Sequence, residues 1–245
     1  MYKIQESICA KLCFFLVAVG CNLKTQNRDK VIKVKEISGY NGTGIDKVSQ
    51  LLEERAALHS INILNWEKYP YMPAVSFRIA HSNNAIWLKY YVEEKSIMAT
   101  VADTNGAVHK DSCVEFFFDP LGDGNYYNFE FNCIGTTHLA FGAGRSDRQF
   151  LAPATIEDAI GVQSSLGTQT FTERTADHSW EMTVVIPASI LSHNPGIKLK
   201  GLNAKGNFYK CGDATSEPHY LSWNPIKTEN PDFHRPEFFG NLVFE

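Results

Sequence analysis

The chain has 245 residues, with 44% hydrophobic and 20% charged residues, a composition typical of a globular protein that buries a large core. The formal net charge of −4 comes without any basic run, which argues against a nucleic-acid partner. Common catalytic signatures, such as the Gly-x-Ser-x-Gly elbow and the His-Glu-x-x-His pair, do not occur, so no motif predicts an enzyme.

The N-terminus has the layout of a secretory signal. Lys3 and Lys11 precede a short apolar run that is too short to span a bilayer as a helix, so we expect residues 1–20 to be cleaved. The small residues directly before Cys21 resemble a bacterial lipobox. We therefore expect Cys21 to carry a lipid, which makes the protein an exported cell-envelope lipoprotein. Ordinary cleavage near the same place is the alternative.

Strand patterns dominate the chain that follows. Residues 21–43 are polar and predict a tether or a loosely held first strand, and apolar residues at helical spacing predict one short helix within 44–58. Period-two alternation predicts strands over 75–80, 86–93, 113–119, 126–132, 137–141, 180–186, 198–204, 207–211, 219–223 and 241–245. Many strands with almost no helix indicate an all-β fold, an antiparallel, jelly-roll-like β-sandwich that forms one domain over 44–245.

The segments 113–119 and 126–132 form the clearest pattern, a β-hairpin with two different faces. One face is apolar and the other carries Glu115 and Glu130, which we expect to lie side by side on paired strands. The predicted core residues are Phe116, Phe118, Phe129, Phe131, Trp180 and Met182. The polar face is where a small hydrophilic ligand could be held.

The hairpin turn contains Asp119, Asp123 and Asn125, whose oxygens could hold a structural calcium ion. Their spacing lacks a full set of oxygen ligands, so we expect a turn in which Asp and Asn cap the backbone. No other cofactor is predicted.

Three cysteines remain beyond Cys21. By the alternation of the hairpin, Cys113 shares a face with Glu115 whereas Cys133 shares a face with Phe129, which is poor geometry for a disulfide. We expect Cys113, Cys133 and Cys211 to be free.

Three segments resemble family 9 carbohydrate-binding modules, in particular the family-9-like proteins secreted by gut Bacteroidetes. They are the run from Asp111 to Asp119, the strand Phe129–Asn132, and the closing run from Ser222 to Leu242, which contains a Ser-Trp and a Phe-Gly-Asn-Leu motif. The resemblance covers roughly residues 75 to 245. It implies a β-sandwich that grips the end of a sugar chain between aromatic rings, with polar side chains ordering the hydroxyls.

The resemblance also implies particular binding residues. The positions that match the family's polar and aromatic binding residues are Glu115, Glu130, Lys210, Asn230 and Phe233. Glu130 stands where the family has an arginine, and Val108 stands where the family has the second stacking tryptophan. One charge is therefore reversed, and one stacking wall is missing.

Several further residues could bind or pack. His234 lies with Phe233 on a turn, where binding residues are common, and Trp223 could be either core or stacking platform. For Trp66, we expect packing under a loop rather than stacking on a sugar. Arg145 and Arg148 could meet a carboxylate or a uronic acid.

These residues predict non-catalytic carbohydrate binding by a monomeric lipoprotein that serves polysaccharide or glycan breakdown, with an oligosaccharide or polysaccharide as partner. The first alternative is a glycoside hydrolase, since Glu115 and Glu130 could lie about 5 Å apart, the separation that retaining enzymes use. The second is a haem-binding redox sandwich with Met98, His109 or His234 as axial ligands aimed into the sandwich. We expect the five matched residues to converge on one solvent-open surface.

Overall fold

The computed structural model describes residues 30–40, 44–82 and 84–245. Its strands are β1 (Val31–Glu36), β2 (Leu58–Ser60), β3 (Ile63–Leu64), β4 (Ala74–His81), β5 (Ala85–Ala99), β6 (Cys113–Asp119), β7 (Tyr126–Asn132), β8 (Thr137–Gly142), β9 (Arg148–Phe150), β10 (Gly161–Ser164), β11 (Phe171–Pro187), β12 (Asn203–Cys211), β13 (Tyr220–Ser222) and β14 (Gly240–Phe244). Its helices are α1 (Ile45–Arg55), α2 (Pro153–Ala159) and the short 3-10 helices η1 (Val108–Lys110), η2 (Ala188–Ile190) and η3 (Pro236–Phe238). The predicted all-β class is confirmed.

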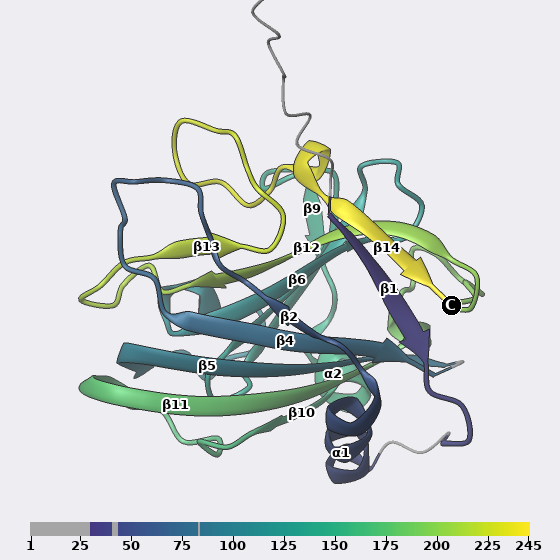
Figure 1. Ribbon diagram of the computed structural model, residues 1–245, viewed down its shortest axis with the longest axis horizontal. Coiled ribbons are helices and arrows are strands. Elements are labelled where there is room, and N and C mark those ends of the chain that lie inside the picture. Colours follow the sequence, from purple (N-terminus) through teal and green to yellow (C-terminus); the bar gives the residue numbers. More distant parts are fainter. Residues whose placement is uncertain (1–29, 41–43, 83) are drawn as a thin grey trace, which may run out of the picture.

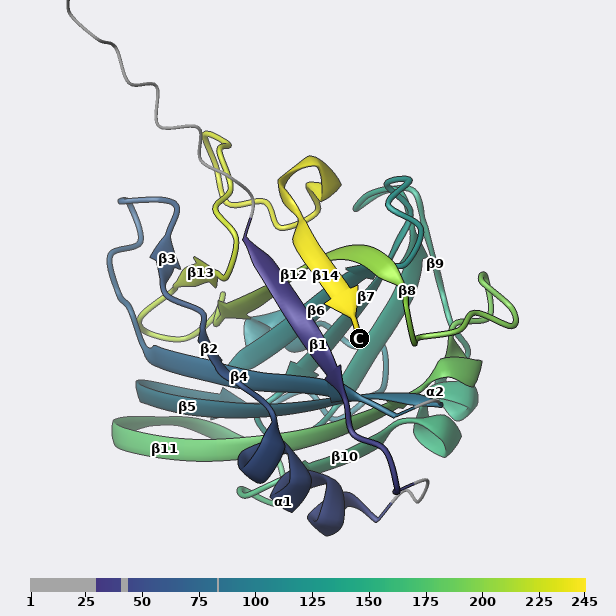
Figure 2. The ribbon, with the colours of Figure 1, turned by 45° about the vertical axis from the view of Figure 1, so that its right-hand side comes forward.

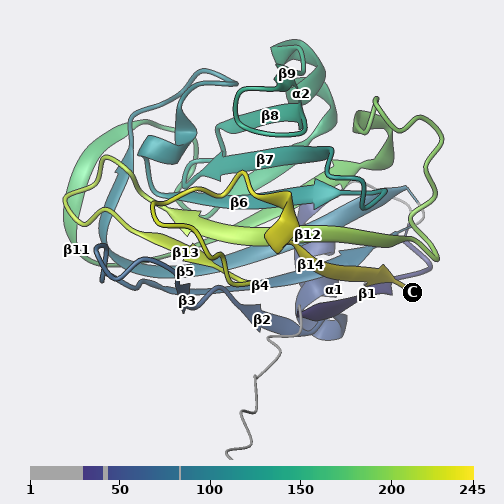
Figure 3. The same cartoon turned by 90° about the horizontal axis from the view of Figure 1, so that it is seen from above.

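Two layers of strands pack face to face and share β1 (Figure 1). We call the layer β14-β12-β6-β7-β8-β9 the β6 sheet, and the layer β4-β5-β11-β10 the β5 sheet. Seen from above, β7, β6 and β12 lie side by side in the β6 sheet (Figure 3). All pairings of the described strands are antiparallel except those of β1, which runs parallel to both β14 and β4.

Strand β1 lies in the segment that we expected to be a tether or a loosely held first strand. Ile32 and Val34 are buried, and β1 leaves β14 at Val34 to pair with β4 at Lys35 and Glu36. The sandwich therefore begins before residue 44. The predicted signal segment and Cys21 lie outside the described residues.

The main core fills the space between the two sheets. Since side chains alternate across a strand, each strand sends every second residue inward. All six predicted core residues belong to this cluster: Phe116, Phe118, Phe129, Phe131, Trp180 and Met182. Phe116 stacks on Phe208 of β12 with ring centroids 4.8 Å apart, which joins neighbouring strands through aromatic contact.

Helix α1 covers the outer side of the β5 sheet (Figure 2). Its buried residues Val48, Leu51 and Leu52 pack in a cluster with Trp87 and Val185, which confirms the helix expected within 44–58. Helix α2 was not predicted, because its seven residues bury only Ile156 and so carry little periodic signal. Within the described residues, neither α-helix has the length and apolar composition needed to cross a bilayer.

Candidate functional site

The outer face of the β6 sheet points away from the main core and carries Glu115 and Glu130. The register pairs Glu115 of β6 directly with Glu130 of β7 and with Tyr209 of β12, so the predicted side-by-side arrangement is confirmed. A second apolar cluster lies over this face, and it includes Trp66 and Phe233 from distant segments of the chain. Glu115 is consequently only 3% exposed and Glu130 only 4% exposed, so the expectation of a solvent-open surface is wrong.

A pocket of about 130 Å³ remains between the outer face and the segments that cover it. An engineered cavity of about 150 Å³ holds benzene, so this volume suits about one six-membered ring. The acidic residues of its wall are Glu115, Glu130, Asp213 and Asp232, and its arginines are Arg145 and Arg148. The arginines were expected as candidates, whereas Asp213 and Asp232 were not singled out from the sequence.

Glu130 is the least satisfied charged group of the pocket. Its Oε1 accepts a hydrogen bond of 2.8 Å from Asn128, while the nearest basic side-chain nitrogens, on His109, His138 and Arg148, stand 3.8–3.9 Å from its oxygens. Its Oε2 is buried and has no hydrogen-bond partner in the described protein. A buried acceptor without a partner costs free energy, so Glu130 is poised to accept a hydrogen bond from a ligand.

Two nitrogens beside Glu130 are also buried without a partner, Nε2 of His138 and Nε of Arg148. The arginine nitrogen is a donor, and the imidazole nitrogen is either donor or acceptor, depending on its tautomer. A ligand that both donates and accepts at adjacent atoms would satisfy these groups together. His138 pairs with Glu130 in register, so extending the alternation from 126–132 into 137–141 would have found it in the sequence.

Glu115 favours its protonated form. Burial, and next the neighbouring Glu130, raise the pKa of Glu115 well above its usual range, and the Cys211 thiol donates to Oε1 at 3.1 Å. A neutral carboxyl at Glu115 can donate a proton in a hydrogen bond as well as accept one.

His234 orders the wall of the pocket and is neutral. Burial, and next the charge of Arg148, lower the pKa of His234 to about 2. Because Arg148 Nη1 lies 3.3 Å from Nε2, that nitrogen accepts, and Nδ1 donates to the Tyr126 hydroxyl at 2.8 Å. His234 therefore positions Arg148.

Phe233 lines the same pocket as Glu115, as the carried-over site implies. It is 8% exposed and stacks on Tyr209 with centroids 4.2 Å apart and planes 6° apart. Asn230 is exposed and does not line the pocket, so the expected convergence fails for this residue. Val108 is fully buried in η1 and offers no ring to a ligand.

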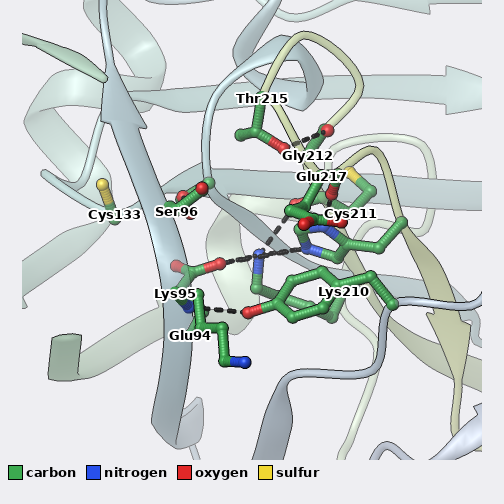
Figure 4. A network of polar contacts seen from close by, with 12 residues as sticks. Glu94, Lys95, Ser96, Cys133, Lys210, Cys211, Gly212, Thr215 and Glu217 are labelled. Carbon is green, nitrogen blue, oxygen red and sulfur yellow. Dashed lines mark hydrogen bonds and ion pairs between the residues drawn. The ribbon is translucent and has the colours of Figure 1, made fainter. Parts of the chain in front are cut away.

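Lys210 does not share the outer face with Glu115, and that prediction is wrong. It pairs with Val114, an inward-facing residue, and its ammonium forms a fully buried ion pair of 2.8 Å with Glu94 of β5 (Figure 4). It also donates to the carbonyl of Cys211 at 2.9 Å and to His219 at 2.8 Å. A shift of one residue along a strand moves a side chain to the opposite face, so the correct outer-face positions on β12 are Tyr209 and Cys211.

The two tryptophans considered as platforms are packing residues. Trp223 is 4% exposed and meets Phe208 edge-to-face at 5.9 Å, so it belongs to the main core, and of the two roles considered for it the binding role is wrong. Trp66 is 5% exposed and donates to the carbonyl of Thr228, as expected for a residue that packs under a loop.

The hairpin turn is organised by Asp119. Its carboxylate accepts backbone hydrogen bonds of 2.7 Å from Gly122 and 2.9 Å from Gly124, and Asp123 accepts one of 2.9 Å from Asn125. These contacts match the self-capping turn that we expected.

The three cysteines beyond residue 29 are free and buried, as predicted. Cys113 lies in the outer-face cluster and Cys133 in the main core, which confirms that they occupy opposite faces. The haem alternative is not supported, because His109 and His234 line the outer pocket rather than the interior, and that pocket is too small for a macrocycle.

The fold and the pocket define a β-sandwich with a small, polar, ring-sized site on the outer face of one sheet. A family model described as carbohydrate-binding family 9 matches residues 46–244, and the chain belongs to this family. A comparison with curated proteins found no match.

Solved structures agree with this assignment. A candidate carbohydrate-binding protein from Bacteroides uniformis is 42% identical over 89% of this chain and 100% of its own, with a TM-score of 0.85. A family 9 carbohydrate-binding module from Caldicellulosiruptor kristjanssonii in complex with glucose is 13% identical, covering 88% of this chain and 96% of its own, with a TM-score of 0.56. The same organism's module in complex with cellotriose is 13% identical over 88% and 94%, with a TM-score of 0.52. At this identity the two modules show the fold alone.

Proposed function

We propose that this protein is a non-catalytic carbohydrate-binding protein that holds one sugar residue, at the end of a chain, in the pocket beside Glu115 and Glu130. The observation that carries the proposal is the buried, unpartnered Oε2 of Glu130 in a pocket of about 130 Å³. A sugar hydroxyl donates one hydrogen bond and accepts others, so adjacent hydroxyls suit a carboxylate acceptor next to the guanidinium nitrogen of Arg148.

The aromatic wall of the pocket supports the same proposal. Phe233 is held rigidly against Tyr209, so little side-chain entropy is lost when a ligand packs on it. The family membership and the relatives named above support a saccharide as the ligand class. The reversed charge at Glu130 argues that the hydroxyls are ordered differently from those in the family's usual sites.

The decisive test is glycan-array binding followed by titration calorimetry on the full chain with the best ligand. Glu130→Gln should weaken binding at least tenfold, because it removes a charged acceptor whose hydrogen bond contributes roughly 1.5–3 kcal/mol. Glu229→Gln, a matched change at an exposed residue, should leave affinity unchanged. Absence of any glycan ligand, or equal affinity of Glu130→Gln and the parent, would exclude the proposed site.

A second candidate function, glycoside hydrolysis, is favoured by one observation, the direct cross-strand pairing of Glu115 with Glu130. The raised pKa of Glu115 would suit a general acid, with Glu130 as nucleophile. Turnover of aryl glycosides by the full chain, abolished in both Glu115→Gln and Glu130→Gln, would establish this function in place of binding alone.

We further propose that the protein is exported and anchored at the cell envelope through a lipid on Cys21, acts as a monomer, and serves polysaccharide or glycan breakdown. The signal-like layout of residues 1–20 and the small residues before Cys21 support the anchor. Cys21→Ser should move the protein from the membrane to the soluble fraction and abolish fatty-acid labelling. A variant that stays membrane-bound would show that the anchor lies elsewhere.

A further inference from the structure

Two thiols and a carboxyl group meet at the floor of the pocket. Cys113 of β6 and Cys211 of β12 face each other in register, and Glu115 lies two residues along β6 on the same face. The Sγ atoms of Cys113 and Cys211 and one oxygen of Glu115 all lie within 4.8 Å of one another. All three residues are at most 3% exposed, so this is a built cluster rather than a chance grouping on the surface.

The spacing suits a tetrahedral metal ion. Zinc binds thiolate sulfur at about 2.3 Å, so two ligand atoms of one tetrahedral ion stand about 3.8 Å apart. Cys211 Sγ lies 3.1 Å from Glu115 Oε1, and no distance between two of the three ligand atoms exceeds 4.8 Å. Small side-chain rotations would therefore bring all three atoms to the required distance.

A second observation points to a ligand at the same place. Cys211 and Glu115 both line the pocket, so an ion can reach the cluster from outside. Across the strand, Glu130 also lines the pocket and has a buried Oε2 without a partner. An ion beside Glu115 would supply positive charge to the two facing carboxyl groups, which have none within 3.5 Å.

We propose that Cys113, Cys211 and Glu115 bind a thiophilic divalent cation, with zinc as the best match, and that its remaining coordination position faces the pocket. Two thiolates and one carboxylate suit zinc, whereas calcium and magnesium prefer oxygen ligands alone. Binding releases the two thiol protons, and also the carboxyl proton where Glu115 is neutral. The three bound anions then exceed the charge of the ion by one.

The experiment is a titration of the reduced full chain with Co²⁺, a spectroscopic substitute for zinc. Coordination by Cys113 and Cys211 should give a thiolate-to-cobalt charge-transfer band in the near ultraviolet, which zinc then removes by displacement. Cys113→Ser and Cys211→Ser should each weaken cobalt binding at least tenfold and reduce the band. Cys133→Ser is the matched control, because Cys133 is equally buried but lies in the main core, and it should leave the band unchanged.

Glu115→Gln keeps both thiols and gives a second measure if a serine variant fails to fold. It should retain a charge-transfer band while lowering cobalt affinity at least tenfold. Cobalt binding without a thiolate band, or a band that Cys133→Ser abolishes, would overturn the proposal. So would a Cys113–Cys211 disulfide found by mass spectrometry in protein isolated without reductant.

The metal site and the sugar site can be tested independently of each other. The serine variants leave Glu130 intact, so a glycan ligand can still be titrated against them. Failure of the cobalt titration with intact glycan binding would reject the metal site alone.

Discussion

Two regions of this molecule bury a glutamate, and they differ in whether a cationic side chain lies against its carboxylate. Between the sheets, Glu94 forms an ion pair of 2.8 Å with Lys210 and accepts a hydrogen bond of 2.7 Å from Trp180 (Figure 4). On the outer face of the β6 sheet, Glu130 has no cationic nitrogen closer than 3.8 Å, and one oxygen without a partner. Both carboxylates are at most 4% exposed, so burial does not distinguish them.

The difference separates a structural charge from a functional one. The Glu94–Lys210 pair joins the two sheets, and the ammonium 2.8 Å from Oε2 balances the charge of the Glu94 carboxylate within the protein. Glu130 keeps an unsatisfied acceptor in a pocket, an arrangement that lowers stability and that ligand binding would relieve. The carboxylates should therefore respond oppositely to mutation.

The largest expected effect is the loss of the interior ion pair. Lys210→Met should lower the free energy of unfolding by about 3–5 kcal/mol, since it leaves Glu94 buried without a cation. Urea denaturation measures the change. The double variant Lys210→Met/Glu94→Gln should recover part of the loss, and Lys198→Met, at an exposed lysine, should change stability by less than about 0.5 kcal/mol. A single variant as stable as the parent would show that the pair is not structural.

Phe233→Ala should affect both binding and stability. The ring is 8% exposed and stacked on Tyr209, so its removal should cost about 3 kcal/mol of stability and at least tenfold in sugar affinity. Leu121, which is 61% exposed in the turn after β6, is the control, and Leu121→Ala should change neither. Thermal unfolding and calorimetry give the two readouts. If Leu121→Ala weakened binding to oligosaccharides as much as Phe233→Ala, Phe233 would not be a specific contact of the sugar.

Each region also holds a neutral, buried histidine, which predicts acid sensitivity. Burial, and next Lys210, lower the pKa of His219 well below its usual range, and His234 is lowered to about 2. The unfolded chain takes up protons on these histidines below pH about 6.5 and the folded chain does not, so the histidines contribute a loss of stability below that value. Glu115 acts in the opposite direction, because its raised pKa lets the folded chain bind that proton first. Each histidine should cost about 1.4 kcal/mol at pH 5.5.

The slope of stability against pH is obtained from the urea midpoints of unfolding measured from pH 7.5 to 5. His219→Gln, whose amide oxygen can accept from Lys210, should reduce the slope without losing the Lys210 contact. A slope that is the same in His219→Gln and in the parent would mean that His219 titrates normally in the folded state.

The smallest expected change in stability gives the clearest contrast between the two regions. Glu130→Gln should raise the free energy of unfolding by about 1 kcal/mol, because it removes a buried charge that lacks a partner. Glu94→Gln, the same substitution in the other region, should lower it, because Lys210 loses its counterion. Two changes of the same sign would remove the distinction between the regions.

Local periodicity determined much of the fold from sequence. The alternation of 113–119 and 126–132 predicts which residues face the core, and the short turn predicts the pairing of Glu115 with Glu130. Such patterns are reliable because a residue's face depends only on its place along its own strand. Lys210 was placed on the outer face through the family resemblance, and an error of one residue in that matching reverses the face.

The tertiary structure alone decided whether the polar face is open or covered. Trp66 and Phe233 are far apart in the chain, yet both lie over the face that carries Glu115, and together they turn an apparent surface into a pocket. The place of β1 between β14 and β4 was decided in the same way. The sequence by itself determined the two faces of each strand, because they follow from neighbouring residues. The pocket depends on how distant segments pack, and no local pattern records that.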